Sequence, residues 1–368
     1  MITEGKVVMG NLKLVVLDNI QELGEEVDKE LMKLTKEENS HMLKTIRSRF
    51  SNGEGKMTIK DTVRDKDIYI LSDVGNYDVT YEMHGFQHRM GPDEHFQDII
   101  RTISALSGYP TKITLISPLL YASRQHKRKG RESLDCAIAL RQLEALGVNH
   151  VVTFDAHDPN VCNAIPNLPF ENIYPTHTIL EKLINEVDLD NILVISPDMG
   201  AMERARYYAD MLSTDVGVFY KRRDLTKVVD GKNPIVEHAY MGAKVRGKTV
   251  IVVDDMIASG GSLIEVGQKL RKKGAKEVIF IATFALFTEG IDKFKKAYKK
   301  HYFDKLYTTN LTYIPNEYKE VEWLKIVNCS KSIAKVIYAL HNGESIKKII
   351  NDQEKMFKKI EKKKESIN

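Results

Sequence analysis

The sequence predicts an α/β fold with two similar domains in tandem, each a mainly parallel sheet flanked by helices. Three observations lead to this prediction. Short apolar runs alternate with amphipathic helical patterns along most of the chain, the same order recurs in both halves, and polar or charged residues follow most of the apolar runs. A chain of 368 residues is long enough for two domains of ordinary size.

The apolar runs have the length of strands, and the segments between them have helical periodicity. The expected strands are 12–17, 67–72, 112–117, 150–154, 191–196, 216–221, 249–254, 277–284 and 306–309. The expected helices include 21–34, 94–106, 132–146, 178–186, 201–212, 262–273 and 290–300. Strands and helices in this order form right-handed βαβ units on a parallel sheet.

The expected organisation is a first domain over residues 1–165, a second over 166–340 and a basic helical tail over 341–368. The stretch 158–174 is rich in Pro and Asn, which makes it the natural junction. We interpret the tail, which ends KMFKKIEKKKESIN, as a solvated and frayed helix end and not as a nucleic-acid patch.

Composition indicates a soluble cytoplasmic protein with no nucleic-acid or membrane partner. Hydrophobic residues make up 42% of the chain and charged residues 29%, and the net charge of +4 is small for this length. No apolar run approaches the roughly 18 residues of a membrane helix, and the N-terminus lacks a secretory pattern. The three cysteines are scattered, which argues for a reducing compartment and against a disulfide framework.

Polar motifs follow the predicted strands where ligands bind in open parallel sheets, outside the carboxyl ends of the strands. These motifs are PLLYASRQHKRKGRE after 117, DAHD after 154, SPDMGAMERAR after 195, KRRD after 220, DDMIASGGS after 253 and ALFTEG after 284. Carboxylates, a histidine, basic clusters and a Gly-rich turn therefore meet at the same kind of sheet edge. Their coincidence predicts a ligand site.

The stretch VVDDMIASGGSL, residues 252–263, suits a sugar phosphate. Gly260 and Gly261 allow a tight turn whose backbone N–H groups point at an anion, and Ser262 would open a helix. We expect a valine at Gly261 to crowd this turn and to exclude a positive φ. Asp254 and Asp255 would repel a phosphate, but they can accept hydrogen bonds from sugar hydroxyls or bind Mg²⁺. Ribose 5-phosphate meets both requirements; the alternative is a plain strand–turn–helix connection with exposed acids.

Several further motifs make the chain similar to a known family. VVDDMIASGGS resembles the ribose-phosphate-binding motif of type I phosphoribosyltransferases and of ribose-phosphate diphosphokinases. RFSNGE, YASRQHKRKGRE, TFDAHDPN, SPDMGAMERAR and YKRRD resemble diphosphokinase segments, in one order over roughly residues 45–350. Ordinary phosphoribosyltransferases lack the N-terminal motifs. The resemblance is therefore to the ribose-phosphate diphosphokinases, also called phosphoribosyl pyrophosphate synthetases, and it implies two phosphoribosyltransferase-like domains.

The resemblance implies transfer of the diphosphoryl group of Mg-ATP to the 1-hydroxyl of ribose 5-phosphate, with release of AMP. Lys221 and Arg223 match a basic catalytic pair on a mobile flap, where they would neutralise developing charge. The polar segment after them, 224–242, is long enough for a lid. The positions that match the ribose 5-phosphate site are Arg223, Asp254, Asp255, Ala258, Ser259, Gly260, Gly261 and Ser262.

The resemblance also implies an ATP site, a Mg²⁺ site and an oligomer. His157 and Asp198 match metal-holding positions, although a histidine is an unusual ligand for a hard cation. In the family, the nucleotide is reached partly from a neighbouring subunit, which implies a homo-oligomer built from dimers and commonly a hexamer. The positions that match the ATP site are Phe50, Asn52, Gly53, Glu54, Arg124 and Gln125.

Four departures from the family pattern are visible, and they leave alternatives open. Asn52 and Ala258 replace usual aspartates, His126 replaces the aspartate of the RQD segment, and residues 76–90 look like an insertion. One alternative is a catalytically silent nucleotide-binding paralogue that regulates an active synthetase. Another is a phosphoribosyltransferase acting on a base, which would explain residues 254–262 but not RFSNGE or RQHK.

Overall fold

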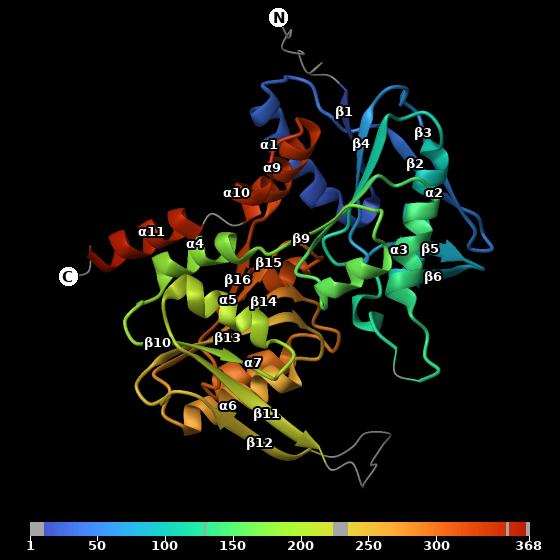
Figure 1. Ribbon diagram of the computed structural model, residues 1–368. Helices are drawn as coiled ribbons and strands as arrows, with labels where there is room; N and C mark the ends of the chain where they lie inside the picture. Colours follow the sequence, from blue (N-terminus) through green and yellow to red (C-terminus); the bar gives the residue numbers. More distant parts are fainter. Residues whose placement is uncertain (1–10, 129, 224–234, 351–352, 366–368) are drawn as a thin grey trace, which may run out of the picture. The chain divides into compact units, whose positions relative to one another are not determined.

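The computed structural model describes residues 11–128, 130–223, 235–350 and 353–365, without the side chains of 221–238, 348, 350, 353, 355, 364 and 365. Its chain divides into two compact units (Figure 1). Unit 1 comprises Met1–Pro175, Asn310–Tyr313 and Asn328–Asn351, and unit 2 comprises Thr176–Thr309, Ile314–Val327 and Asp352–Asn368. This division differs from the expected one, because unit 1 runs past residue 165 and two later segments return to it.

Unit 1 is built on a parallel sheet whose spatial order follows the chain, β1-β4-β7-β8-β9. The strands are β1 (Leu12–Val16), β4 (Asp67–Leu71), β7 (Lys112–Ile116), β8 (His150–Phe154) and β9 (Phe170–Ile173). All neighbouring pairs are parallel. The sheet therefore has no point at which the strand order reverses.

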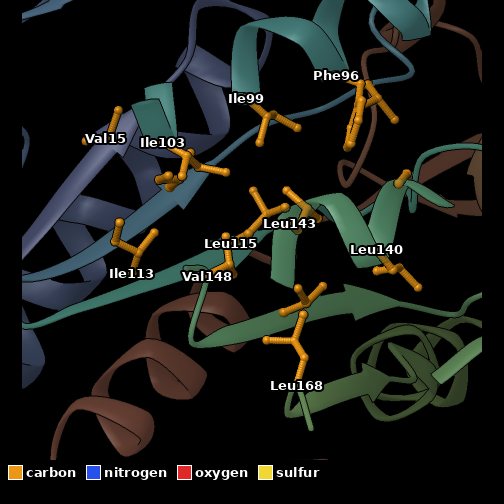
Figure 2. Close-up of a cluster of buried hydrophobic side chains, with 14 of the residues drawn as sticks. Val15, Phe96, Ile99, Ile103, Ile113, Leu115, Leu140, Leu143, Val148 and Leu168 are labelled. Atoms are coloured by element: carbon orange, nitrogen blue, oxygen red, sulfur yellow. The ribbon is translucent and has the colours of Figure 1, made fainter. Parts of the chain in front are cut away.

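Helices α1 (Gln21–Thr35), α2 (Pro92–Leu106) and α3 (Asp135–Ala145) accompany this sheet. Figure 2 shows α2 and α3 contributing Phe96, Ile99 and Leu140 to a core with the strand residues Val15 and Leu115. Alternate strand residues point to the opposite face, as the period of a strand requires. Helix α1 packs there against α9 (Ser330–His341), which comes from the last segment of unit 1 together with the short helix α10 (Lys347–Ile350).

Two small antiparallel hairpins extend unit 1. The first joins β2 (Thr45–Arg49) to β3 (Gly55–Ile59), and the second joins β5 (Thr80–Met83) to β6 (Phe86–Arg89). The second hairpin lies within the apparent insertion at residues 76–90. Neither hairpin was among the predicted strands, because both are short, polar and without a run of buried residues.

Unit 2 contains a 7-stranded sheet in the order β12-β11-β10-β13-β14-β15-β16. Its strands are β10 (Ile192–Ser196), β11 (Val216–Arg223), β12 (Ile235–Met241), β13 (Thr249–Ile257), β14 (Glu277–Ala285), β15 (Lys305–Thr309) and β16 (Leu324–Val327). Only β12 pairs antiparallel among these strands. The chain moves outward from β10 to β12 and then returns to the other side of β10 with β13, so the strand order reverses between β10 and β13.

Helices cover both faces of this second sheet. Val250 and Val252 of β13 pack with α6 (Gly261–Lys272) and α7 (Asp292–Lys299), whereas Ile251 and Val253 pack with α4 (Thr176–Glu186) and α5 (Met202–Leu212). A one-turn helix, α8 (Asn316–Lys319), precedes β16. The predicted fold class is confirmed, since each unit is a mainly parallel sheet with helices packed on it.

Two sequence interpretations need correction. The stretch 158–174, expected as the junction, belongs to unit 1 and ends beside its boundary at Pro175, because it contains a short 3₁₀ helix (Pro159–Ala164) and β9, the last strand of the first sheet. The tail is not a frayed end over the part described. Helix α11 (Gln353–Glu365) buries Met356 and Ile360 against α4 and α5, and Lys359 pairs with Glu181 of α4.

The remaining expectations concern cysteines and membrane spans. Cys136, Cys162 and Cys329 are all free thiols, which agrees with the prediction of no disulfide framework. Among the helices described, none is both long and apolar enough to cross a bilayer.

Candidate active site

In unit 2 the strand order reverses between β10 and β13, which are parallel neighbours. Strand β10 pairs with β13 only as far as Ile195 opposite Val252. Strand β13 continues beside β14 until Ile257 pairs with Ala285. The edge of β13 that follows Val252 is therefore released where β10 turns away. In open α/β sheets this is the position at which ligands bind.

Asp254 and Asp255 lie on that released part of β13. Asp255 is buried, Asp254 is partly buried, and the backbone N–H of Asp255 donates to Oδ1 of Asp254 at 3.0 Å. Burial, and then the charge of Asp255 beside it, raise the pKa of Asp254 well above the usual range of an aspartate. Arg204 opposes this rise, and Asp198 adds to it. The site therefore concentrates negative charge that a ligand hydroxyl or a cation would relieve.

Asp198 lies in the loop between β10 and α5, at the other side of the reversal. Its Oδ1 accepts from the backbone N–H groups of Gly200 at 2.8 Å and Ala201 at 3.2 Å, and its carbonyl oxygen accepts from the Ser196 hydroxyl at 2.6 Å. Arg204 is in the first turns of α5. The structure thus brings together Asp198, Arg204 and the two acids of β13, as expected from the positions of their motifs.

The Gly-rich turn forms a cradle between β13 and α6. Gly260 has φ 76°, and a Cβ built there would lie 2.2 Å from the ring of Phe294. Only glycine fits this conformation and this close approach. Helix α6 starts at Gly261, and its first N–H groups have no carbonyl partner within the helix. Ser262 is exposed at the same end, so the turn presents donors and a positive helix terminus to an anion.

The steric argument for Gly261 was wrong. A Cβ at Gly261 would meet no atom within 4 Å, and the positive φ belongs to Gly260. Ala258 anchors the turn through its backbone, because its carbonyl accepts from the N–H of Thr288 at 3.1 Å. Its side chain is not needed for that contact. Ser259 is half-buried within the same turn.

Lys221 and Arg223 are the last residues of β11 that the structure places. The backbone of Lys221 pairs with His238 and that of Arg223 with Ile235, with an irregularity in register between Arg222 and Arg223. Their side chains, and residues 224–234 of the expected lid, lie outside the described part of the structure.

The predicted nucleotide residues of RFSNGE form the turn between β2 and β3. Phe50 is 53% exposed, and Asn52 and Glu54 are also exposed, so this side of the turn is open to a ligand. The turn is closed by bonds between the backbones of Phe50 and Glu54 at 2.8 Å and of Gly53 and Phe50 at 2.8 Å. Oδ1 of Asn52 accepts from the N–H of Glu54 at 3.1 Å. The amide nitrogen of Asn52 takes no part in that bond.

The second predicted nucleotide segment follows β7. Arg124 and Gln125 are exposed on a short 3₁₀ helix, Ser123–Gln125, and His126 follows them. The His126 ring lies 5.4 Å from that of His157, and its Nε2 is 3.1 Å from Oδ2 of Asp158. The structure therefore brings the RQH segment and His157 together at one edge of the first sheet.

Sequence reasoning missed the residues that support these nucleotide segments. Asp98 of α2 is buried and accepts from Arg49 at 2.8 Å and from Arg101 at 2.6 Å. Asp93 accepts from the Tyr121 hydroxyl at 2.8 Å, and Phe96 stacks on Tyr121 at 4.4 Å between ring centroids. The i, i+3 spacing of Asp98 and Arg101 was the one visible signal, since the other partners are distant in sequence.

The residues present suit a Mg²⁺ ion that is bound partly by substrate oxygens. They do not suit a metal ion whose ligands all come from the protein. Across the described residues, no set of three or more His, Cys, Asp or Glu side chains is arranged to hold a metal ion. Mg²⁺ commonly binds through one or two carboxylates together with substrate phosphates and water. Asp198 and Asp254 offer such oxygens, whereas the His157 imidazole suits a hard cation less well.

This fold, with its parallel sheets and flanking helices, is that of a phosphoribosyltransferase-like α/β protein. Residues 171–324 match the phosphoribosyl transferase domain family, and residues 12–147 match the family described as the N-terminal domain of ribose phosphate pyrophosphokinase. Ribose-phosphate pyrophosphokinases from Ralstonia nicotianae and Mycoplasma genitalium are 30% and 28% identical to the chain over 251 and 310 residues. Those alignments cover 67% and 83% of this chain and 72% and 86% of the relatives.

A solved structure agrees with these sequence matches. The phosphoribosylpyrophosphate synthetase from Mycobacterium smegmatis is 25% identical, with a TM-score of 0.74 over 90% of this chain and 99% of that one. The chain belongs to the ribose-phosphate pyrophosphokinase family. Members of this family are transferases of nucleotide biosynthesis. The recognition of this family and enzyme class from the sequence motifs is confirmed.

Proposed function

We propose that the protein transfers the β,γ-diphosphoryl group of Mg-ATP to the 1-hydroxyl of ribose 5-phosphate, giving 5-phosphoribosyl 1-diphosphate and AMP. The observation that carries the proposal is the arrangement of side chains and backbone at the end of β13. Two carboxylates there adjoin a turn of exposed backbone donors, held in shape by the positive φ of Gly260. A phosphate at the turn would leave the sugar hydroxyls of the same ligand at Asp254 and Asp255.

Each part of the cradle has one role in this proposal. Backbone N–H groups of residues 258–262 and the start of α6 bind the 5-phosphate. Asp254 and Asp255 accept hydrogen bonds from the ribose hydroxyls and orient the ring. The sugar is thereby fixed with its 1-hydroxyl ready for an incoming phosphorus atom, and such positioning is the main requirement of phosphoryl transfer.

Lys221 and Arg223 would provide positive charge that neutralises the negative charge developing on the transferring phosphates. Both extend from the end of β11, and Arg223 would also contact ribose 5-phosphate. Their positive charges would stabilise the transferring diphosphoryl group more strongly in the transition state than in the ground state. Mg²⁺, held by Asp198 and substrate oxygens, would neutralise phosphate charge when bound. His157, on unit 1, is the other residue proposed to serve a metal ion.

Unit 1 would supply the ATP contacts. Phe50 offers an exposed ring for stacking on a base, and Asn52, Gly53 and Glu54 complete the turn that carries it. Arg124 and Gln125 would bind from the segment after β7. We also propose a cytoplasmic homo-oligomer in which the turn of one subunit serves the nucleotide of its neighbour.

The test is a direct assay. Purified protein is mixed with ATP, Mg²⁺ and ribose 5-phosphate, and AMP and phosphoribosyl diphosphate are quantified. We expect the two products in equal amounts, and omission of ribose 5-phosphate should abolish AMP formation. Binding of both ligands without either product would favour the silent regulatory paralogue. Pyrophosphate release when phosphoribosyl diphosphate and a nucleobase are supplied instead would favour a phosphoribosyltransferase.

A further inference from the structure

The β5–β6 hairpin is seated directly on the turn that carries Phe50 and Asn52. The backbone N–H of His84, at the tip of the hairpin, donates to the carbonyl of Ser51 at 2.9 Å. A Cβ built on Gly53 would lie 2.7 Å from the sulfur of Met83, so the hairpin packs against the turn where only glycine leaves room. Gly53 has φ 93°, which independently favours glycine there.

Tyr81 of β5 links the hairpin to the turn by a second route. The guanidinium of Arg49 lies over the Tyr81 ring, 4.9 Å from its centroid. The same guanidinium donates through one nitrogen to the carbonyl of Gly53 at 3.4 Å and through the other to Asp98 at 2.8 Å. The ring of Tyr81 therefore packs against one face of the Arg49 guanidinium, and that guanidinium holds the turn through its bond to Gly53.

The other end of Tyr81 is fixed by the first turn of α2. Its hydroxyl donates to Oε1 of Glu94 at 2.6 Å. Oε2 of Glu94 accepts from the N–H of Gly91 at 3.0 Å and lies 3.2 Å from Nε2 of His88 on β6. Burial opposes ionisation of Glu94, but the hydrogen bonds from Tyr81, Gly91 and His88 lower its pKa, so it is present as a carboxylate. The contacts of Tyr81 and His88 with Glu94 therefore join the hairpin to the first turn of α2, and the Gly91 bond caps that turn.

We propose that the β5–β6 hairpin is a positioning element for the nucleotide-binding turn, and that Tyr81 is its main positioning residue. This inference rests on the proposed function, since it takes residues 50–54 to be ATP contacts. The hairpin touches the turn at its backbone and leaves the Phe50 ring exposed. It therefore fixes the shape of the turn and need not contact ATP. A turn whose side chains are mostly exposed gains the preorganisation that tight nucleotide binding needs.

The test uses three full-length variants and two substrates. Tyr81→Ala removes both the ring under Arg49 and the bond to Glu94, so the KM for ATP should rise about tenfold. Tyr81→Phe keeps the ring and loses the hydroxyl, and should give a smaller rise. Glu82→Ala is the matched control, because Glu82 is the neighbouring, exposed residue of β5 and points to the other face of the strand. The KM for ribose 5-phosphate should stay within about twofold in all three.

Binding of a non-hydrolysable ATP analogue, measured by titration calorimetry, gives a readout that does not need turnover. An unchanged ATP affinity in Tyr81→Ala and Tyr81→Phe would overturn the positioning role. Parallel losses for both substrates, together with a lower melting temperature, would also overturn it by showing a general structural role. If the wild type binds the analogue but forms no AMP, the proposed reaction fails, and the effect of Tyr81 on analogue binding still decides the positioning role.

Discussion

The aspartates at the carboxyl ends of the strands have different surroundings in the two units. In unit 1 the strand order follows the chain without reversal, and in unit 2 it reverses between β10 and β13. Asp73, after β4 of unit 1, is 1% exposed, and its carboxylate accepts from Thr312 and from the N–H groups of Gly75 and Tyr313. Asp254, on β13 of unit 2, lies where that strand extends beyond its pairing with β10.

This difference separates two uses of a buried acid. Asp73 is surrounded by protein donors, and its hydrogen bonds hold the segment Asn310–Tyr313 within unit 1. Asp254 has another carboxylate beside it and a released strand edge. A carboxylate that is hydrogen-bonded by protein donors stabilises the fold. A carboxylate that lies beside another carboxylate is suited to binding a ligand or a cation. The nucleotide contacts proposed for unit 1 lie chiefly on additions to its sheet, above all on the β2–β3 turn.

The largest effect should come from the basic end of β11 in unit 2. Lys221→Ala and Arg223→Ala should each lower turnover by roughly 10²–10³, because a preorganised donor to the transition state is lost. Affinity for ribose 5-phosphate should fall much less. Steady-state kinetics and a ribose 5-phosphate titration measure the two effects, with Arg222→Ala as the charge-matched control. Near-normal turnover in both variants would remove these residues from catalysis.

The next prediction concerns the ionisation of Asp73, the buried acid of unit 1. Burial raises the pKa of Asp73 to about 6, although hydrogen bonds from Gly75, Tyr313 and Thr312 oppose the rise. The folded-state pKa is thus above the value of 3.8 for an exposed aspartate. Protonated Asp73 carries no ionisation penalty below pH ~4, and the penalty grows to about 3 kcal/mol as the pH rises through ~6. Asp73→Asn cannot ionise and escapes this penalty.

Amide hydrogen exchange of the β4 backbone at pH 4.5 and 7.5 measures the opening free energy of unit 1 in each variant. We expect Asp73→Asn to be less stable than wild type, with a deficit that shrinks by roughly 2 kcal/mol at the higher pH. Exposed Asp78, replaced by Asn, should follow wild type at both values. A deficit that is independent of pH would show that Asp73 does not ionise in this range.

Paired glycine variants should distinguish strain from exposure in the cradle of unit 2. Gly260→Ala places a Cβ 2.2 Å from Phe294 and requires a positive φ, so it should cost about 1–3 kcal/mol of stability and weaken ribose 5-phosphate binding. Gly261→Ala meets no neighbouring atom and should change stability by less than about 0.5 kcal/mol. Thermal unfolding and ribose 5-phosphate titration would measure both. Equal losses in the two variants would contradict the geometry of the turn.

The smallest effect concerns base recognition in unit 1. Because Oδ1 of Asn52 accepts from Glu54, its amide nitrogen faces outward as a donor. Asn52→Asp would place an acceptor there, which suits the amino group of adenine and repels the carbonyl of guanine. The ratio of kcat/KM for ATP over GTP should therefore rise about fivefold in this variant. An unchanged ratio would show that residue 52 does not read the base.

The sequence predicted the parts of the fold with strong periodicity. All nine expected strands and seven expected helices are present, because runs such as residues 249–254 must be buried on both faces. The β2–β3 and β5–β6 hairpins were missed, since their strands are polar and are stabilised by contacts with α2 and with each other. Strands β9, β12 and β16 were also missed, as their pairing depends on neighbours distant in sequence.

Prediction of the candidate site had a similar limit. Motif position placed Asp198, Arg204, Asp254 and Asp255 together, because they follow strands that become neighbours in unit 2. It could not identify which glycine has the positive φ, which depends on the packing of Phe294 against Gly260. It also could not identify Tyr81, whose partners come from two other elements of unit 1.

The return of residues 328–351 to unit 1 has a consequence for synthesis on the ribosome. Helix α1 is made early, but its packing partner α9 begins at Ser330, and Glu26 of α1 accepts from Asn328 at 2.9 Å. The emerging N-terminal half must therefore wait with an apolar helix face uncovered while nearly the whole of unit 2 is translated. Contacts between such distant parts of a chain slow folding and prolong exposure to aggregation, so this polypeptide should depend on a chaperone until α9 emerges.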